Sequence, residues 1–330
     1  MDANTLALFW AGVIAVSILI YVVLDGYDLG VGILYGTTRN PAHRDHMMAS
    51  IAPFWDGNET WLIVVGASLF GAFPIVYAVF LSAFYLPVLL LLLGLIFRGV
   101  AFEFRYRTER NRWLWDWGFF LGSVVVSFVQ GAAMGTMIRG IPVVDGHYAG
   151  GAFEWVAPFP IFCGVGLVLG YALLGASWLV LKSDHDLRDW AYRRIPWLVG
   201  GVVIVLIVAI VSTFDIRDRL ERNVASHYWA VIFPLLGALA LVGVLVGARK
   251  QRDGWPFAMT ALFFLMAFIT LAEMFWPYMI PYSITVTNAA APAQSLEFMF
   301  YAGIVVLPVI LIYSAVVYWV FRGKLRRTYS

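Results

Sequence analysis

Five carboxylic acids in the first third of the chain lie inside stretches that are otherwise strongly apolar. They are Asp25, Asp28, Asp56, Glu59 and Glu103. Asp25 and Asp28 are three residues apart, as are Asp56 and Glu59, so on a helix each of these two pairs would share one face. A single base, Arg98, stands in the same kind of surroundings. Ionisable groups in an apolar interior are costly, which makes them functional candidates.

The charges of this group do not balance. Five carboxyls and one guanidinium cannot all stay ionised in a medium of low dielectric constant, because desolvation and like-charge repulsion both oppose it. The composition of the group therefore predicts carboxyls that exchange protons. We expect Arg98 to neutralise a neighbouring acid rather than to bind a substrate.

Each acid also has a purely structural interpretation. The first pair could satisfy backbone groups that are freed if a helix is interrupted around Gly26 and Gly30. The second pair could cap the helix that it begins, because acids favour helix N-termini. Glu103 could be an interfacial residue paired with Arg105 or Arg107. Gly26 and Gly30 also form a stripe of small residues that allows another helix to approach closely.

The whole chain has the composition of an integral membrane protein. Of its 330 residues, 62% are hydrophobic and 13% are charged, against about 25% charged in soluble domains. Aromatic residues reach 17%, and Trp and Tyr favour the membrane interface. The one cysteine, Cys163, lies in an apolar run and is expected to be a buried thiol, so there is no disulfide framework.

Nine stretches are long and apolar enough to cross a membrane as helices, which takes about 20 residues each. They are approximately 6–35, 54–80, 81–104, 113–138, 158–182, 196–214, 227–248, 256–276 and 298–321. We expect Phe73-Pro74 to mark the turn between the second and third spans. The longest connections are 139–157 and 277–297, and the second is expected to form an interfacial cap.

The sequence thus predicts an all-α membrane protein of about nine transmembrane helices in a single domain, residues 1–330. Residues 1–138 would form a first four-helix bundle with the acids, residues 158–276 a second bundle, and 298–321 one additional peripheral helix. Of the 22 lysines and arginines, 17 fall in loops on one side. Because such loops stay cytoplasmic, we expect the N-terminus outside and the C-terminus in the cytoplasm.

The histidines do not suit a haem site in this chain. All of them lie in loops or at the edge of a span: His43, His46, His147, His185 and His227. Haem in a helical bundle needs axial ligands such as His or Met that project inward. The sequence also lacks a P-loop, a dinucleotide-binding glycine motif and a nucleic-acid footprint. We expect no cofactor, metal ligand or catalytic residue in this chain.

The polar segments carry a family resemblance. The segments are Asp25–Gly32, Ser50–Leu62, Phe97–Arg105 and Trp115–Gly118. They resemble subunit II of the bacterial cytochrome bd-type quinol oxidases, most specifically in the run Trp55-Asp56-Gly57-Asn58. The match is dense over residues 20–135 and elsewhere rests on length and span count. The short loops and the run 276–278 resemble the cyanide-insensitive branch of that family.

This resemblance implies a heterodimer in the bacterial cytoplasmic (inner) membrane. A larger subunit I would carry b-type haems and haem d, oxidise quinol, and reduce oxygen to water with cytoplasmic protons. In the family, acids that match Asp25, Asp56 and Glu103 line a proposed proton path, and in some members the tryptophan that matches Trp61 lies beside an oxygen route. Some members have Asp in place of Glu103, which changes its reach. A structural quinone and a small single-helix accessory subunit are further family features.

The candidate proton pathway is therefore Asp25, Asp28, Asp56, Glu59, Glu103 and Arg98, and two other classes of function compete with it. An ion-coupled secondary transporter would place coupling sites near the midplane in corresponding positions of both halves, whereas these acids lie in one half of the chain. A structural scaffold subunit, in which the acids only pack and pair, would need the same residues. Haem b and haem d absorbance in a complex purified from the native membrane would favour the oxidase.

Overall fold

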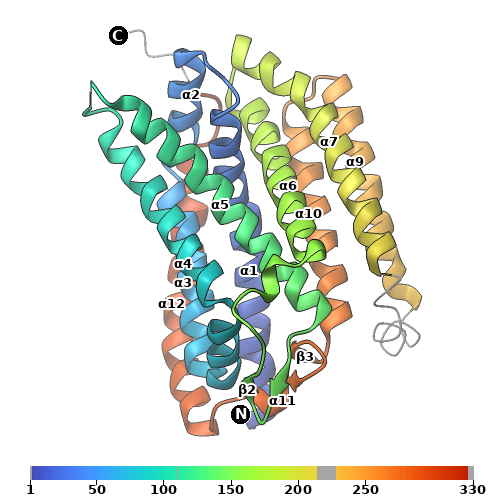
Figure 1. Cartoon of the computed structure of the whole chain (residues 1–330). Helices are drawn as coiled ribbons and strands as arrows, with labels where there is room; N and C mark the ends of the chain where they lie inside the picture. Colours follow the sequence, from blue (N-terminus) through green and yellow to red (C-terminus); the bar gives the residue numbers. More distant parts are fainter. Residues whose placement is uncertain (1, 109, 214–227, 326–330) are drawn as a thin grey trace.

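The chain folds into a bundle of long helices, shown in Figure 1. The structure is a computed structural model and describes residues 2–108, 110–213 and 228–325. Its α-helices are α1 (Ala3–Tyr35), α2 (Pro41–Ile51), α3 (Trp55–Ala72), α4 (Pro74–Phe104), α5 (Arg112–Arg139), α6 (Pro158–Lys182), α7 (His185–Thr213), α9 (Ile232–Arg249), α10 (Gly254–Phe275), α11 (Val286–Ala289) and α12 (Ala293–Val320). Short 3-10 turns, η1 and η3, lie at Glu154–Val156 and Tyr228–Val231.

Eight helices of the described residues are long and apolar enough to cross a membrane: α1, α4, α5, α6, α7, α9, α10 and α12. The second expected span corresponds to α3, which has 18 residues. Its first two turns hold Asp56, Asn58 and Glu59, and these polar residues make it less apolar than the others. It packs beside α1, α4 and α12 within the bundle.

The boundary between the second and third expected spans needs a correction. The predicted ranges change at residues 80 and 81, but the chain turns at Phe73 and α4 begins at Pro74. Proline suits the first position of a helix because its missing N–H has no partner there. The expected turn at Phe73-Pro74 is therefore confirmed. Further along, Pro87 crowds the backbone one turn before it, and α4 bends at Phe84, whose dihedral angles are not helical.

Two helices differ from the sequence prediction for the same reason. The helix α7 begins at His185, eleven residues before the predicted start of 196, and α2 is not predicted at all. Both segments are polar overall but bury one face: α7 buries Leu187, Ala191 and Ile195, and α2 buries Met47 and Ile51. An amphipathic helix of this kind gains its stability from packing and is missed by a search for apolar spans. The predicted limits 214 and 227 lie outside the described residues.

The helix α1 lies at the centre of the bundle and packs against α3, α5 and α6. The stripe of small residues makes this possible: a Cβ atom on Gly30 would lie 1.8 Å from the carbonyl oxygen of Tyr171, and one on Gly26 would lie 2.7 Å from the Tyr171 ring. The expected close helix approach is thus confirmed, with α6 as the partner. Because α1 and α5 both pack on α6, the two halves share one interior, and their division into separate four-helix bundles stays a prediction.

The two ends of the bundle are built differently. The end that carries α2 and the last turn of α12, at the top of Figure 1, is called the α2 end below. At the opposite hairpin end, residues 139–157 contain the antiparallel strands β1 (Val143–Val144) and β2 (His147–Tyr148). Residues 277–297 contain β3 (Tyr278–Ile280), β4 (Ile284–Thr285) and α11. The second connection packs against the end of the bundle, where Ile280, Ala289 and Leu296 are fully buried, and so forms a cap.

Candidate functional site

Three of the predicted residues meet in the centre of the bundle, one from each of α1, α3 and α4. Arg98 of α4 donates hydrogen bonds from Nη1 to Asp25 Oδ1 at 3.2 Å and to Glu59 Oε1 at 2.9 Å. The side chains of Asp25 and Arg98 are 0% exposed, and that of Glu59 is 21% exposed. The expected pairing of Arg98 with a neighbouring acid is confirmed.

Asp28 belongs to the same cluster through α3. Its Oδ2 accepts a hydrogen bond of 2.6 Å from the side-chain amide of Asn58, and it interacts electrostatically with Arg98 and Glu59. Asn58 also donates to the Tyr27 hydroxyl at 3.0 Å, while its Oδ1 accepts from Tyr318 at 3.0 Å. We call Asp25, Asp28, Glu59 and Arg98 the buried acid cluster.

A second group of polar side chains continues from Asp25 along α1. Tyr21, one turn before Asp25, interacts with it electrostatically and accepts a hydrogen bond of 2.8 Å from Gln130 of α5. Tyr171 of α6 donates to the other end of the same amide at 3.0 Å. Gln130 therefore joins α1, α5 and α6 beside the cluster. Sequence reasoning did not include Gln130, Asn58 or the tyrosines among the candidate site residues. An uncharged polar side chain costs much less than a charge in an apolar stretch, so it does not stand out there.

The structure does not bring Asp56 and Glu103 into this cluster. Asp56 lies in the first turn of α3 with an exposed side chain, one turn before Glu59. Glu103 is 67% exposed and forms an ion pair of 3.6 Å with Arg107. The expectation that all five acids lie deep and together is therefore wrong for these two. Their helices turn these positions outward, and the phase of a helix relative to its neighbours is set by packing that spacing alone does not reveal.

The structural interpretations of the acids have different outcomes. The helix α1 is continuous from Ala3 to Tyr35, so Asp25 and Asp28 do not serve an interrupted backbone. The N-cap of α3 is Phe54 and makes no side-chain capping bond, although Asp56 in the first turn suits the positive end of the helix. For Glu103, pairing with Arg107 is what the structure shows.

Trp61 lies three residues after Asn58, on the buried side of α3. Its side chain is 2% exposed, and its indole Nε1 has no hydrogen-bond partner among the described residues. A buried indole N–H normally finds an acceptor, so this group is open to a polar partner. The structure thus places Trp61 inside the subunit rather than at its surface.

A separate ion-pair network closes the α2 end. Asp116 of α5 accepts hydrogen bonds from Tyr35, Arg44 and Arg105, and Asp45 of α2 pairs with Arg105 at 2.6 Å. Partial burial opposes the charge of Arg105, but hydrogen bonds to the two aspartates outweigh it and raise the pKa of this guanidinium. The network joins α1, α2 and α5 to Arg105, the residue that follows α4.

Neither a metal centre nor a histidine ligand is found in the part of the chain that the structure describes. No group of three or more His, Cys, Asp or Glu side chains there could hold a metal ion. The described histidines lie in α2, in β2 and at the first residue of α7, so none projects from the middle of a spanning helix. The described histidines are therefore not placed to act as axial ligands of a haem within the bundle.

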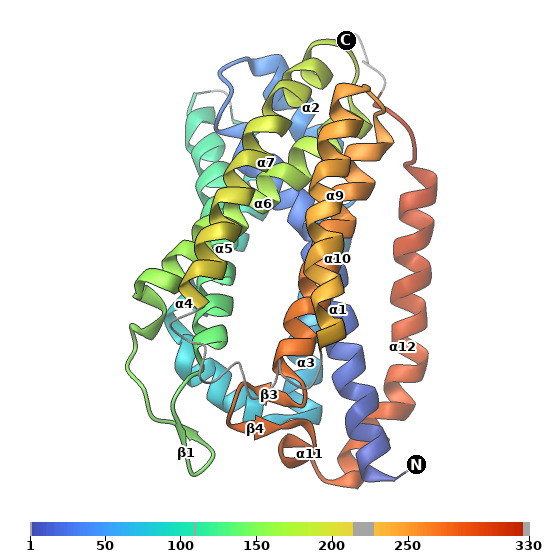
Figure 2. The ribbon, with the colours of Figure 1, turned by 90° about the vertical axis from the view of Figure 1, so that its right-hand side faces the viewer.

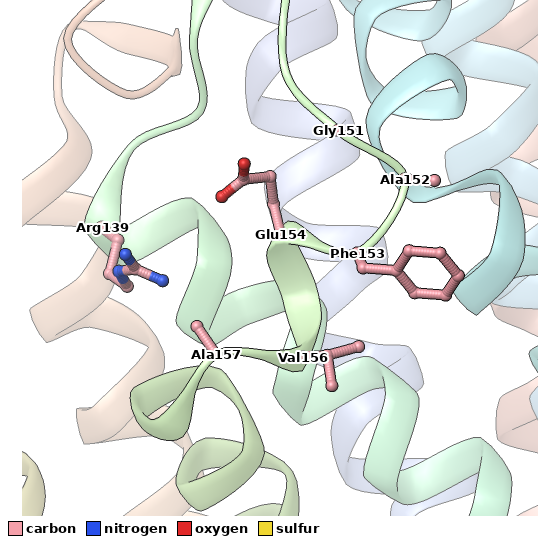
Figure 3. Close-up of a pocket in the computed structure, with 7 residues that line it drawn as sticks. All are labelled: Arg139, Gly151, Ala152, Phe153, Glu154, Val156 and Ala157. Carbon is pink, nitrogen blue, oxygen red and sulfur yellow. The ribbon is translucent and has the colours of Figure 1, made fainter.

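The hairpin end carries a shallow pocket, shown in Figure 3. Its volume is about 400 Å³, and it is lined by Arg139 and by residues of the 151–157 segment, including Glu154. The pocket is wide open and lies at the opposite end of the bundle from α2. It has no contact with the buried acid cluster.

Fold and site together define a multi-pass helical membrane protein with a buried, charged centre. The family model for cytochrome bd terminal oxidase subunit II matches residues 6–321, and the chain belongs to this family. Cytochrome bd-I ubiquinol oxidase subunit 2 of Escherichia coli (strain K12) is 32% identical over 99% of this chain and 97% of its own length. Cytochrome bd ubiquinol oxidase subunit 2 of Bacillus subtilis (strain 168) is 33% identical over 96% and 95%.

A solved structure shows the same fold. A chain of the bd oxidase from Geobacillus thermodenitrificans superposes with a TM-score of 0.80 at 16% identity, covering 96% of this chain and 98% of that one. The protein is thus a multi-pass membrane subunit of a bacterial respiratory oxidase complex. This finding replaces the transporter interpretation. Assignment to the cyanide-insensitive branch stays a prediction.

Proposed function

We propose that this subunit helps to deliver protons to the haems of a larger partner subunit. That partner would carry haem b and haem d, oxidise a quinol, and reduce oxygen to water, while this chain binds no haem and braces it. The observation that carries the proposal is the buried acid cluster, in which Asp25, Asp28 and Glu59 face a single base, Arg98.

The charge balance of the cluster supports proton exchange. Three carboxyls and one guanidinium would carry a net charge of minus two if all were ionised, at a site where Asp25, Asp28 and Arg98 are fully buried. Unpaired charge at such a site is strongly disfavoured, so the cluster holds protons as well as charges. Small changes in its surroundings, such as a charge on a nearby haem, would then move a proton.

The unfilled hydrogen-bonding capacity of the cluster supports a path through water. Asp25 Oδ2, Asp28 Oδ1, Arg98 Nε and Arg98 Nη2 are buried and have no partner among the described residues. Buried polar atoms are almost always hydrogen-bonded, often to ordered water. A water molecule needs two to four polar partners, which these four atoms can provide. Water held between them would connect Asp25, Asp28 and Arg98 for proton transfer.

The path would begin at the α2 end. The loops there hold the arginines and lysines expected on the cytoplasmic side, such as Arg44, Arg105, Arg112 and Lys324. We propose that this end faces the cytoplasm and that Asp56, exposed on α3, receives protons and passes them to Glu59. Glu103 would attract protons at the same surface, and Trp61 would line an oxygen route. The family of this subunit also implies a structural quinone and an accessory single-helix subunit in the complex.

The proposal is tested with Asp25→Asn in the intact complex. The variant keeps the shape and removes a titratable group, so we expect normal haem content and quinol oxidase turnover per haem d lower by about tenfold, or ~1.4 kcal/mol in the barrier. Glu273→Gln is the matched control: it changes an acid of α10 far along the chain from the cluster and should leave turnover unchanged. A scaffold role predicts the opposite pattern, a lower yield of complex with unaltered turnover per haem d.

A further inference from the structure

The C-terminal helix α12 is almost unburied, yet it reaches the buried acid cluster. Along most of its length the apolar side chains face outward, including Phe298, Ile304 and Ile312, which are 77%, 55% and 64% exposed. Figure 2 shows it at the edge of the bundle beside α1. Near its end, however, the hydroxyl of Tyr318 enters the space between α1 and α3 and contacts Tyr27 and Asn58.

The hydrogens in this contact have one consistent arrangement. Asn58 Oδ1 can only accept, so Tyr318 donates its single proton to it across 3.0 Å. Tyr27 must then donate to Tyr318, with 2.5 Å between their hydroxyl oxygens, and it accepts in turn from the Asn58 amide. The three groups form a closed ring. The remaining proton of the Asn58 amide points to Asp28 Oδ2 at 2.6 Å.

The reverse orientation of the Asn58 amide is unfavourable. It would place the amide oxygen against the Asp28 carboxyl oxygen at 2.6 Å and against the Leu24 carbonyl oxygen at 3.3 Å. Two oxygen acceptors facing each other at such distances repel unless one carries a proton. Without the Tyr318 hydroxyl, the favoured orientation would lose the donor that holds its Oδ1. The amide would then turn more freely, and Asp28 would lose a fixed partner.

From this geometry we infer that Tyr318 is a positioning residue of the oxidase. It orients Asn58, and through Asn58 it fixes the Asp28 carboxyl in the buried acid cluster. The inference rests on the proposed role of that cluster in proton delivery. The inference also assigns a role to α12, because this helix has few buried side chains but supplies the Tyr318 hydroxyl that completes the hydrogen-bonded ring.

The end of α12 is anchored so that Tyr318 stays in register. Lys182 of α6 donates from Nζ to the carbonyl oxygens of Phe321 at 2.6 Å and Gly323 at 3.2 Å, and its own carbonyl accepts from Leu325 N at 3.0 Å. Its ammonium also lies over the Phe54 ring, 5.1 Å from the centroid. That ring packs against Tyr318 with 4.8 Å between centroids. The ring of residue 318 is therefore held by packing that does not need the hydroxyl.

The test compares Tyr318→Phe with Tyr313→Phe in the full complex. The first variant keeps the aromatic ring and removes only the hydroxyl that takes part in the hydrogen-bonded ring. The second alters a tyrosine of the same helix that is 55% exposed. We expect normal haem content in both. For Tyr318→Phe, turnover per haem d should fall about two- to tenfold, the effect of one lost hydrogen bond, and the pH profile of turnover should shift. Tyr313→Phe should match the parent.

A double-variant cycle identifies the residue through which Tyr318 acts. The titratable groups around Asp28 are Asp25 of α1, Glu59 of α3, Arg98 of α4, Tyr27 and Tyr318 itself. If Tyr318 acts through Asp28, adding Tyr318→Phe to Asp28→Asn should change turnover little further, because the two effects are not independent. Additive effects would overturn the inference, as would an unchanged pH profile and turnover in Tyr318→Phe. If Asp25→Asn lowers turnover while Tyr318→Phe does not, the inference fails and the proposed function stands.

Discussion

Asp56 and Glu59 are one turn apart on α3, yet their surroundings differ. The side chain of Asp56 is exposed, whereas Glu59 is 21% exposed and bonds Arg98 in the interior. The carboxylate of Asp56 acts electrostatically on Glu59. This arrangement suits a transfer from the surface to the interior, because a proton accepted by Asp56 lies within one helical turn of a carboxyl that already belongs to the cluster.

We therefore predict that Asp56→Asn lowers turnover per haem d by about tenfold, or ~1.4 kcal/mol in the barrier, with normal assembly. Asp56→Glu, which keeps the titratable group, should retain most of the turnover. Glu103→Gln should have a smaller effect, because Glu103 is paired with Arg107 at the surface. Turnover and haem d content of the purified complexes check this. A drop in yield with unaltered turnover per haem d would show that Asp56 acts only in folding.

The residues of the site could be predicted only where charge revealed them. The cost of a buried charge singled out Asp25, Asp28 and Arg98 without any structure, and all three are fully buried. Asn58 and Tyr318 are uncharged, and 260 residues separate them, so no local pattern joins them. A similar limit explains why the exposure of Asp56 was not predicted. Residue spacing shows which residues share a face of a helix, but not what that face packs against.

At the scale of elements, the contact between α1 and α6 determines the geometry of the interior. Both helices have glycine where they meet: the Cβ of an alanine at position 30 would overlap the Tyr171 carbonyl at 1.8 Å, and one at Gly175 would lie 2.3 Å from the Gly30 carbonyl carbon. Backbone atoms cannot move aside as a side-chain end can. The helices can therefore tolerate a methyl group here only by separating.

Gly30→Ala should consequently destabilise the subunit by about 3 kcal/mol or more, as expected for a rigid overpacked contact. Gly12→Ala, on the same helix, meets nothing within 4 Å and serves as the control. Thermal unfolding of the solubilised complex, followed by haem d absorbance, measures both. Equal midpoints for the two variants would mean that α1 and α6 are not in close contact.

The elements of the α2 end are tied together by Asp253, just before α10. It accepts hydrogen bonds from Arg188 at 2.8 Å, Tyr192 at 2.7 Å and Lys324 at 2.6 Å. Partial burial opposes its ionisation, but the three hydrogen bonds outweigh it and lower the pKa of Asp253 to about 2 from the ordinary 3.8. The carboxylate thus joins α7, α10 and the segment after α12.

This lowered pKa predicts a pH-dependent stability. A group whose pKa is lower in the folded state stabilises the protein above its unfolded pKa, here about 4, and loses this contribution as pH falls towards 2. Relative to the parent, Asp253→Asn should lose about 2 kcal/mol of stability near neutral pH. The difference in unfolding midpoint should narrow below pH 4. Asp145→Asn in the β1–β2 turn is the control, and a difference independent of pH would contradict the assignment.

For the whole molecule, composition predicted the class of fold, and packing decided the details. Apolar stretches located α1, α5 and α6 to within a few residues. They missed α2 and the first eleven residues of α7, because these segments are polar on one side and are held by contacts with the rest of the bundle. The charge distribution adds an orientation. The α2 end gathers arginines and lysines in four connections, and the hairpin end has few.

We predict from this asymmetry that the α2 end faces the cytoplasm, since loops rich in lysine and arginine are retained there. In a Cys163→Ser background, a cysteine at Asn111 should react only with reagents that enter the cytoplasm, and one at Asn288 should react from outside. Both positions are exposed, at opposite ends of the bundle. The cysteine is placed at Asn288 rather than at the neighbouring Ala289, because Ala289 is buried and a reagent would not reach it. The reverse labelling pattern would place Asp56 and Glu59 near the outer surface. Protons would then reach the buried acid cluster from outside the cell, which contradicts a cytoplasmic source.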